Sequence, residues 1–144
     1  MGVLQRIALT YFFAATTIYF FKGVRTFYAA MVMLLAYWAV CLLGNPADPY
    51  SLNGWFGTNI DKWLLGTSHL YKGEGMPFDP EGLMSTMPAI AQVLLGYLVG
   101  NHIKEKGSTK ESVPVMLNGL FIAAIALLVT GFYWDMAMPI NKKI

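Results

Sequence analysis

Charged residues are scarce in this sequence. They make up 12% of the 144 residues, about half of the ~25% that is usual in soluble domains. Cysteine occurs only once, at Cys41, so no disulfide can form within the chain and no cysteine-based zinc pattern exists. No phosphate-binding loop, nucleophile elbow or nucleic-acid-binding pattern is present. These absences argue against a disulfide-stabilised secreted domain, a zinc protein and a nucleic-acid-binding protein.

Hydrophobic residues, by contrast, reach 56% of the chain, and the mean hydropathy is +0.51. Four apolar stretches lie near residues 3–21, 27–43, 83–103 and 113–134. About 20 apolar residues are needed to cross a bilayer as a helix, so each stretch is near spanning length. We therefore expect an all-α membrane protein with about four transmembrane helices in a single transmembrane region, residues 1–144. Cys41 falls inside the second stretch, where a buried apolar role is expected.

The distribution of charge predicts which side each loop faces. The links at 22–25 and 101–112 are short and rich in Lys and Arg, whereas the long link at 44–80 is mainly acidic. Short basic loops mark the cytoplasmic side, so loop 44–80 and both chain ends are predicted to face outward. Lys142 and Lys143 then lie on the outer side, where this rule does not expect basic residues. The first stretch lacks a basic run and a cleavage site, and is not expected to be a secretory signal.

Part of the long outer loop has a helical pattern. Ile60, Trp63, Leu64 and Thr67 share one face of a helix over residues 60–71, while Asp61, Leu65 and Ser68 share another. We expect a short amphipathic helix at the outer interface, with Trp63 and Tyr71 at headgroup depth. Gly66 weakens this prediction.

The motif Asp79-Pro80-Glu81-Gly82 stands directly ahead of the third apolar stretch and has two compatible interpretations. In the first, Asp79 caps the helix, Pro80 takes its first position and Glu81 favours the positive end of the helix dipole. In the second, the carboxylates form a site at the outer edge of the membrane for a cationic or hydroxyl-rich ligand.

The two histidines fall on opposite sides of the membrane in this topology. His69, near Asp61, is a candidate general base, although an interfacial histidine bonded to a loop backbone is the simpler interpretation. His102 is expected at a helix C-terminus, where the dipole favours it. A metal site shared by the two is therefore not expected.

Gln5 and Arg6 enter the first apolar stretch at its outer edge. Arg6 either extends to the interface, as basic residues near helix ends commonly do, or binds a carboxylate such as Glu81 or an anionic ligand. Gly96 and Gly100 form a Gly-x-x-x-Gly pair, which predicts a close helix-packing face.

Several of these segments, taken in order, resemble a known family. They are Gly2–Ala8, Ile60–Gly66 leading to His69–Tyr71, the acidic motif with Ser85–Ile90, and Pro139–Lys143. Together they are similar to the heparan-alpha-glucosaminide N-acetyltransferase family and its bacterial relatives, over essentially the whole chain. The resemblance implies a polytopic acyltransferase of the membrane, in bacteria the inner membrane. Such enzymes move an acetyl group from acetyl-CoA, supplied from the cytoplasm, to the amine of a terminal glucosamine on the other side.

The resemblance also implies that this sequence is a middle fragment of a larger helical bundle. The family has about eleven transmembrane helices, more than 144 residues hold at about 20 residues per helix. The helices before and after it, and the outer loop with the family's catalytic histidine, have no counterpart here. We therefore expect the chain to be inactive alone.

The site residues that the resemblance implies fall into two groups. Glu81 and Asp79 would attract the ammonium of the amino sugar, and His69 would support a general base located elsewhere. The residues expected to line the substrate or cofactor site are Arg6, Gln5, Asp61, Asn141 and Lys142. The expected cofactor is acetyl-CoA, without a metal, and the expected partners are membrane lipid and an amino sugar but no nucleic acid. Formation of a homo-oligomer stays open.

One alternative function belongs to a different class. The chain would then be a non-enzymatic membrane module, such as a transporter half or an assembly subunit, whose acidic outer loop binds a solute or a partner.

Overall fold

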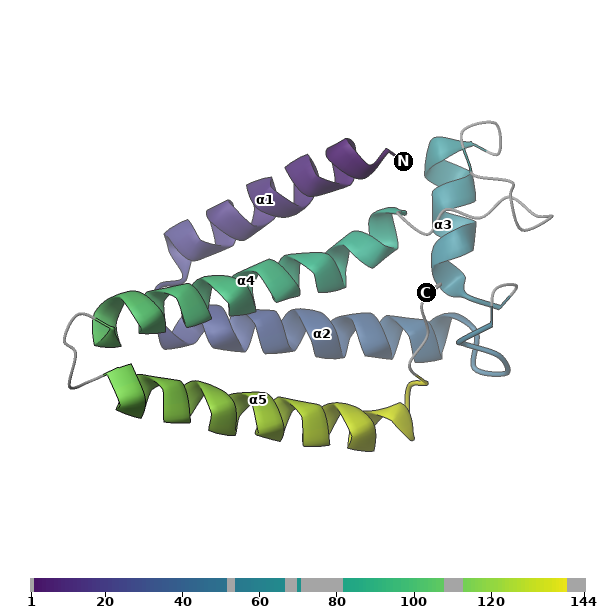
Figure 1. Cartoon of the computed structure of the whole chain (residues 1–144). Coiled ribbons are helices and arrows are strands. Elements are labelled where there is room, and N and C mark those ends of the chain that lie inside the picture. The colour runs from purple at the N-terminus through teal and green to yellow at the C-terminus, as the bar shows by residue number, and fades with distance from the viewer. Residues whose placement is uncertain (1, 52–53, 67–69, 71–81, 108–112, 140–144) are drawn as a thin grey trace. The chain divides into compact units, whose positions relative to one another are not determined.

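The computed structural model describes residues 2–51, 54–66, 70, 82–107 and 113–139. Five helices lie in these ranges: α1 (Val3–Phe20), α2 (Val24–Gly44), α3 (Phe56–Leu65), α4 (Leu83–Lys106) and α5 (Val113–Asp135) (Figure 1). No strand occurs among the described residues. The expected all-α class is confirmed.

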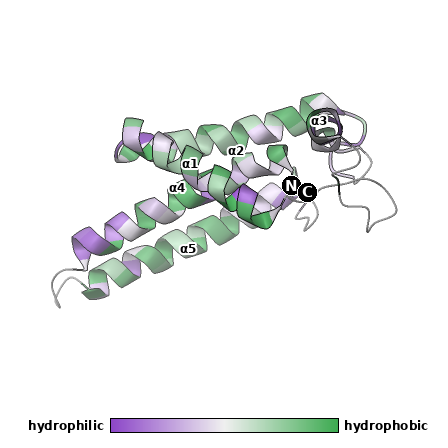
Figure 2. Ribbon diagram, turned by 90° about the horizontal axis from the view of Figure 1, so that it is seen from above, coloured by the Kyte–Doolittle hydropathy of each residue, from purple (hydrophilic) through white to green (hydrophobic). Residues whose placement is uncertain are grey.

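The long helices α1, α2, α4 and α5 coincide with the four apolar stretches, and each is long and apolar enough to cross a membrane. Their surfaces are hydrophobic over most of their length (Figure 2). In α5, none of the most apolar 18-residue window is buried, and side chains such as Phe121 and Ile125 are exposed. Apolar surface of this extent is stable in lipid rather than water, so the chain is an integral membrane protein.

The described residues form two compact units, and α4 contributes to both. The first unit contains α1, α2, α3 and the part of α4 up to Leu95. Its core is a cluster of Ala14 from α1, Ala30 from α2 and Ile90, Ala91 and Leu94 from α4. Alanines let helix backbones approach closely, which is how helices pack where lipid removes the hydrophobic driving force between them.

Helix α3 runs crosswise to the long helices of the first unit, beside the end of α2 (Figure 1). The side chain of Phe56 packs closely over Gly44, the last residue of α2. α3 ends at Gly66, whose φ of 72° lies in the left-handed region that favours glycine. The expected helix over residues 60–71 therefore begins four residues earlier, at Phe56, and stops at Leu65.

The two faces predicted for α3 differ in burial. The side chain of Asp61 is fully buried, at 0% exposed, whereas Trp63 is 83% exposed and Leu64 53%. The face that packs on the unit carries the small and polar residues Gly57, Thr58 and Asp61. Trp63 points outward, as an interfacial tryptophan would, and Thr67, Ser68 and Tyr71 lie outside the described residues.

The second unit contains α4 from Gly96 onward and α5. His102 lies near the C-terminal end of α4, as predicted. Its Nε2 atom faces Gly119 of α5: a Cβ built on that glycine would stand 4.0 Å from it. For the predicted packing face at Gly96 and Gly100, no described residue lies within 4 Å of a Cβ built on either glycine, so the face stays a prediction.

If α4 crosses the membrane, Asn59 on α3 and Ser108 after α4 must lie on opposite sides. We expect Asn59→Cys, in a Cys41→Ala background, to react with a membrane-impermeant maleimide on intact cells. Ser108→Cys should react only after lysis, because its loop is predicted to be cytoplasmic. Labelling is read by mass shift, and the reverse pattern would contradict the orientation.

Candidate functional site

A polar junction joins α1 and α3 to the start of α4 in the first unit. Its members are Arg6, Asp61, Gly82, Leu83 and Ser85, and we call it the α4 junction. Oδ1 of Asp61 accepts a hydrogen bond from the backbone N–H of Leu83, the first residue of α4, at 2.9 Å. The first amides of a helix have no partner within it, and the usual cap is a side chain just ahead. Here the cap comes from 22 residues earlier in the chain.

Gly82 makes this cap possible. A Cβ built on Gly82 would stand 1.7 Å from Oδ2 of Asp61, so the buried carboxylate occupies the space that any other side chain would need. The Gly82 carbonyl accepts the hydroxyls of Ser85 at 2.9 Å and Thr86 at 3.1 Å, both from buried side chains. The first turn of α4 is thus held both by Asp61 and by its own hydroxyl groups.

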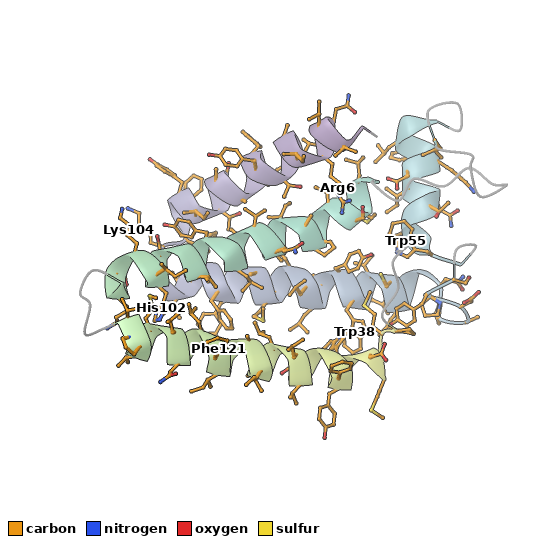
Figure 3. The ribbon with its side chains drawn as sticks, in the orientation of Figure 1. Arg6, Trp38, Trp55, His102, Lys104 and Phe121 are labelled. Atoms are coloured by element: carbon orange, nitrogen blue, oxygen red, sulfur yellow. The ribbon has the colours of Figure 1, made fainter. Side chains whose placement is uncertain are left out.

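Arg6 reaches the same turn from α1. Its Nη2 donates a hydrogen bond to the carbonyl of Ser85 at 3.2 Å, across 79 residues of sequence, and Figure 3 shows the side chain directed at the start of α4. This contact differs from each of the interpretations made from the sequence, because the partner is a neutral backbone carbonyl. The guanidinium has five N–H donors and keeps its charge when it bonds to such a group.

The electrostatics of Asp61 follow from its burial. Burial raises the pKa of this carboxyl above its ordinary value, and the hydrogen bond from Leu83 opposes the rise. Oδ2 of Asp61 and Oγ1 of Thr58, one turn earlier on α3, have no hydrogen-bond partner among the described residues. A buried polar atom without a partner is uncommon in folded proteins.

Apolar and aromatic side chains lie beside this polar pair. Trp55, which precedes α3, is 1% exposed, and Cys41 of α2 is buried as the sequence predicted. The Tyr37 hydroxyl and the Cys41 thiol lie within interaction range of each other and of Trp55. The side of α3 that faces α2 is therefore a mixed environment of aromatic rings and hydroxyl groups.

The structure brings two of the predicted site residues, Arg6 and Asp61, to the same turn of α4. It does not bring Gln5 there: this exposed side chain accepts the Gly2 N–H at 3.1 Å and caps its own helix, α1. The remaining predicted site residues lie outside the described residues, and they are Glu81, Asp79, His69, Asn141 and Lys142. Within the described ranges, no group of three His, Cys, Asp or Glu side chains could hold a metal ion.

The sequence reasoning missed the structural importance of Gly82, Ser85 and Thr86. A glycine followed by two hydroxyl residues at the mouth of a membrane helix is a signal for a polar, closely packed helix start, and it was present in the sequence. Thr58 was also missed, although it lies one helical turn from Asp61 and therefore on the same face.

Replacing Asp61 with asparagine should change how stability depends on pH. Because the folded protein holds the Asp61 proton more tightly than the unfolded chain does, this residue contributes most stability below its ordinary pKa of 3.8, and the contribution is lost as pH rises through the folded pKa. The asparagine side chain keeps an amide oxygen for the N–H of Leu83 and does not titrate. We expect the Tm of the wild type in detergent, relative to Asp61→Asn, to fall from pH 4 upward.

The control for this pair is Asp48→Asn. Asp48 is exposed and accepts a hydrogen bond from Ser51. This variant should retain the wild-type pH dependence. The raised pKa of Asp61 would be contradicted if the Tm difference between wild type and Asp61→Asn did not change with pH. It would also be contradicted if the variant became the more stable of the two as the pH falls.

Gly82→Ala should destabilise the protein by about 1–3 kcal/mol, the usual range for overpacking, since the new methyl group collides with Asp61. Combining it with Asp61→Gly should cost less than the sum of the two single changes, because the collision is then absent. Gly96→Ala is the matched control: its Cβ meets nothing, and Ala is the better helix former. Chemical denaturation in detergent measures the free energy of unfolding of the two single variants, the double variant and the control. If the cost of the double variant equalled the sum of the two single costs, the close contact between Gly82 and Asp61 would be contradicted.

Comparison of the chain with protein-family models, with curated proteins and with solved structures finds no match. The function is therefore argued from the residues and their geometry.

Proposed function

We propose that this chain forms part of a membrane acyltransferase that moves an acetyl group from acetyl-CoA to the amine of a terminal glucosamine-type sugar across the membrane. The proposal rests first on the ordered motifs that resemble the heparan-alpha-glucosaminide N-acetyltransferase family. It places the enzyme in a bacterial inner membrane, with loop 44–80 on the non-cytoplasmic side.

The observation that supports it best is the α4 junction. Three of the segments that carry the resemblance, those containing Arg6, Asp61 and Ser85, are far apart in sequence and are joined by hydrogen bonds at one turn of α4. Random similarity of short motifs would not require them to meet. Their convergence at one point is what a shared site would produce, because a site gathers residues from separate segments.

The chemistry of the transfer sets the roles of the residues. The sugar arrives as an ammonium, loses a proton to a base, and its nitrogen then attacks the thioester carbonyl. A C–N bond forms, the C–S bond breaks, and the thiolate leaves and takes a proton to become the thiol of coenzyme A. Carboxylates at 79 and 81 would attract the ammonium before it loses its proton.

Asp61 and Arg6 are positioning residues in this scheme. Asp61 holds Leu83 to α3, and Arg6 holds Ser85 to α1. Leu83 and Ser85 follow Glu81 by two and four positions. A catalytic group a small distance out of place loses a large part of its effect, so the rigidity of this turn would matter for the carboxylates just ahead of it.

The test is Glu81→Gln in the complete gene product, with acetylation of glucosamine measured in membranes. We expect a loss of at least about 100-fold in rate, as for removal of a charged group that acts on the reacting centre, with normal insertion of the protein. Glu105→Gln is the matched control, because Glu105 is exposed near the other end of α4 and should leave the rate unchanged.

Retained activity in Glu81→Gln would overturn the role of the acidic motif. Failure of the complete protein to bind acetyl-CoA would overturn the acyltransferase assignment and favour a non-enzymatic membrane module.

A further inference from the structure

A groove of about 450 Å³ runs between α1 and the first half of α4. Its apolar lining consists of Val3, Ile7, Tyr11, Ala89 and Val93. Ile7 and Tyr11 are 58% and 71% exposed, so the groove is open along the membrane-spanning part of α1. The volume lies within the ~300–1,000 Å³ that is usual for small-molecule sites.

Three polar side chains also line this groove: Arg6, Thr10 and Gln92. Arg6 lies in the first turns of α1, which at about 1.5 Å per residue is close to the membrane surface. Its hydrogen bond to Ser85 uses one of five donors. A fixed cation at the mouth of an apolar groove is complementary to a ligand with an anionic head and an apolar tail.

The hydroxyl of Thr10 does not open into the groove. A threonine in a helix commonly donates its hydroxyl to the carbonyl four residues earlier, as Thr16 and Thr17 of the same helix do at 2.8 Å. Thr10 does not: it is 6% exposed, and its Oγ1 has no partner among the described residues. A hydroxyl buried to this degree is out of reach of a ligand in the groove, so it is not one of the ligand contacts.

From this geometry we infer that the groove between α1 and α4 binds an anionic phospholipid. The phosphate is held by the guanidinium of Arg6, and an acyl chain lies along Ile7, Tyr11 and Val93. Arginine suits this role because its planar fork matches phosphate oxygens. The inference uses neither acetyl-CoA nor the acidic motif. It shares Arg6 with the proposed function, but lipid binding is measured without acetylation, so either can fail alone.

The test is native mass spectrometry of the purified chain in detergent, titrated with phosphatidylglycerol or phosphatidylcholine. We expect one phosphatidylglycerol to bind at concentrations where phosphatidylcholine does not. Arg6→Gln should weaken that binding about tenfold or more, the effect of losing a hydrogen bond to a charged group.

Two further variants distinguish binding in this groove from lipid adsorbed elsewhere on the helices. Ala89→Leu fills the groove without changing charge and should abolish the selective binding, whereas Arg25→Gln, which removes an exposed charge outside the groove, should leave it intact. Inorganic phosphate at the same concentration should not displace the lipid, because it lacks the acyl chain.

The inference is overturned by equal binding of the two lipids, by a loss in Arg25→Gln as large as in Arg6→Gln, or by unchanged binding in Ala89→Leu. Displacement by inorganic phosphate would show an anion site without a lipid tail and would also overturn it.

Discussion

The first backbone amides of α4 need a partner, and this constraint organises the first unit. A helix that starts at the edge of a membrane leaves N–H groups that neither lipid nor the helix itself satisfies. In this chain a buried carboxylate from another helix meets that need at Leu83. The position of α3, the absence of a side chain at Gly82 and the inward polar face of α3 all follow from placing Asp61 there.

Burying a carboxylate is costly unless it is paired or neutral. Asp61 receives one hydrogen bond, and burial raises its pKa, so the neutral form is favoured more than in an exposed aspartate. A neutral carboxyl can still accept at Oδ1, and its proton then lies on Oδ2, next to Gly82. The cap therefore does not depend on charge, which distinguishes it from the dipole-based cap that Asp79 and Glu81 suggest in the sequence.

The parts of the fold that local composition determines were predictable. The four spans were found because an apolar run of spanning length is rarely stable outside a membrane, and the structure places α1, α2, α4 and α5 at those positions. Gly66 weakened the predicted helix over residues 60–71, and α3 stops just before it. The pattern separated Trp63 and Asp61 onto two faces, but which face packs inward depends on contacts far along the chain, such as the one between Asp61 and Leu83.

The α4 junction was predictable only in part, because its contacts are not local. Arg6 and Asp61 were selected from the sequence through a family pattern, while their partners, a carbonyl and an amide of α4, carry no sequence signal at all. The Gly-x-x-x-Gly pair is visible in the sequence, but the motif does not say which segment packs against it. No described residue lies within 4 Å of a Cβ built on Gly96 or Gly100, so this prediction stays open.

The charge balance at the junction links its geometry to what it can bind. Arg6 donates to a neutral carbonyl and Asp61 accepts from a neutral amide, so neither hydrogen bond cancels a charge. The guanidinium stays protonated at any physiological pH. Arg6 also lines the apolar groove between α1 and α4. Because its hydrogen bond to Ser85 leaves its charge uncancelled, Arg6 can still attract an anion, and the phosphate of a lipid in the groove is the anion that this position favours.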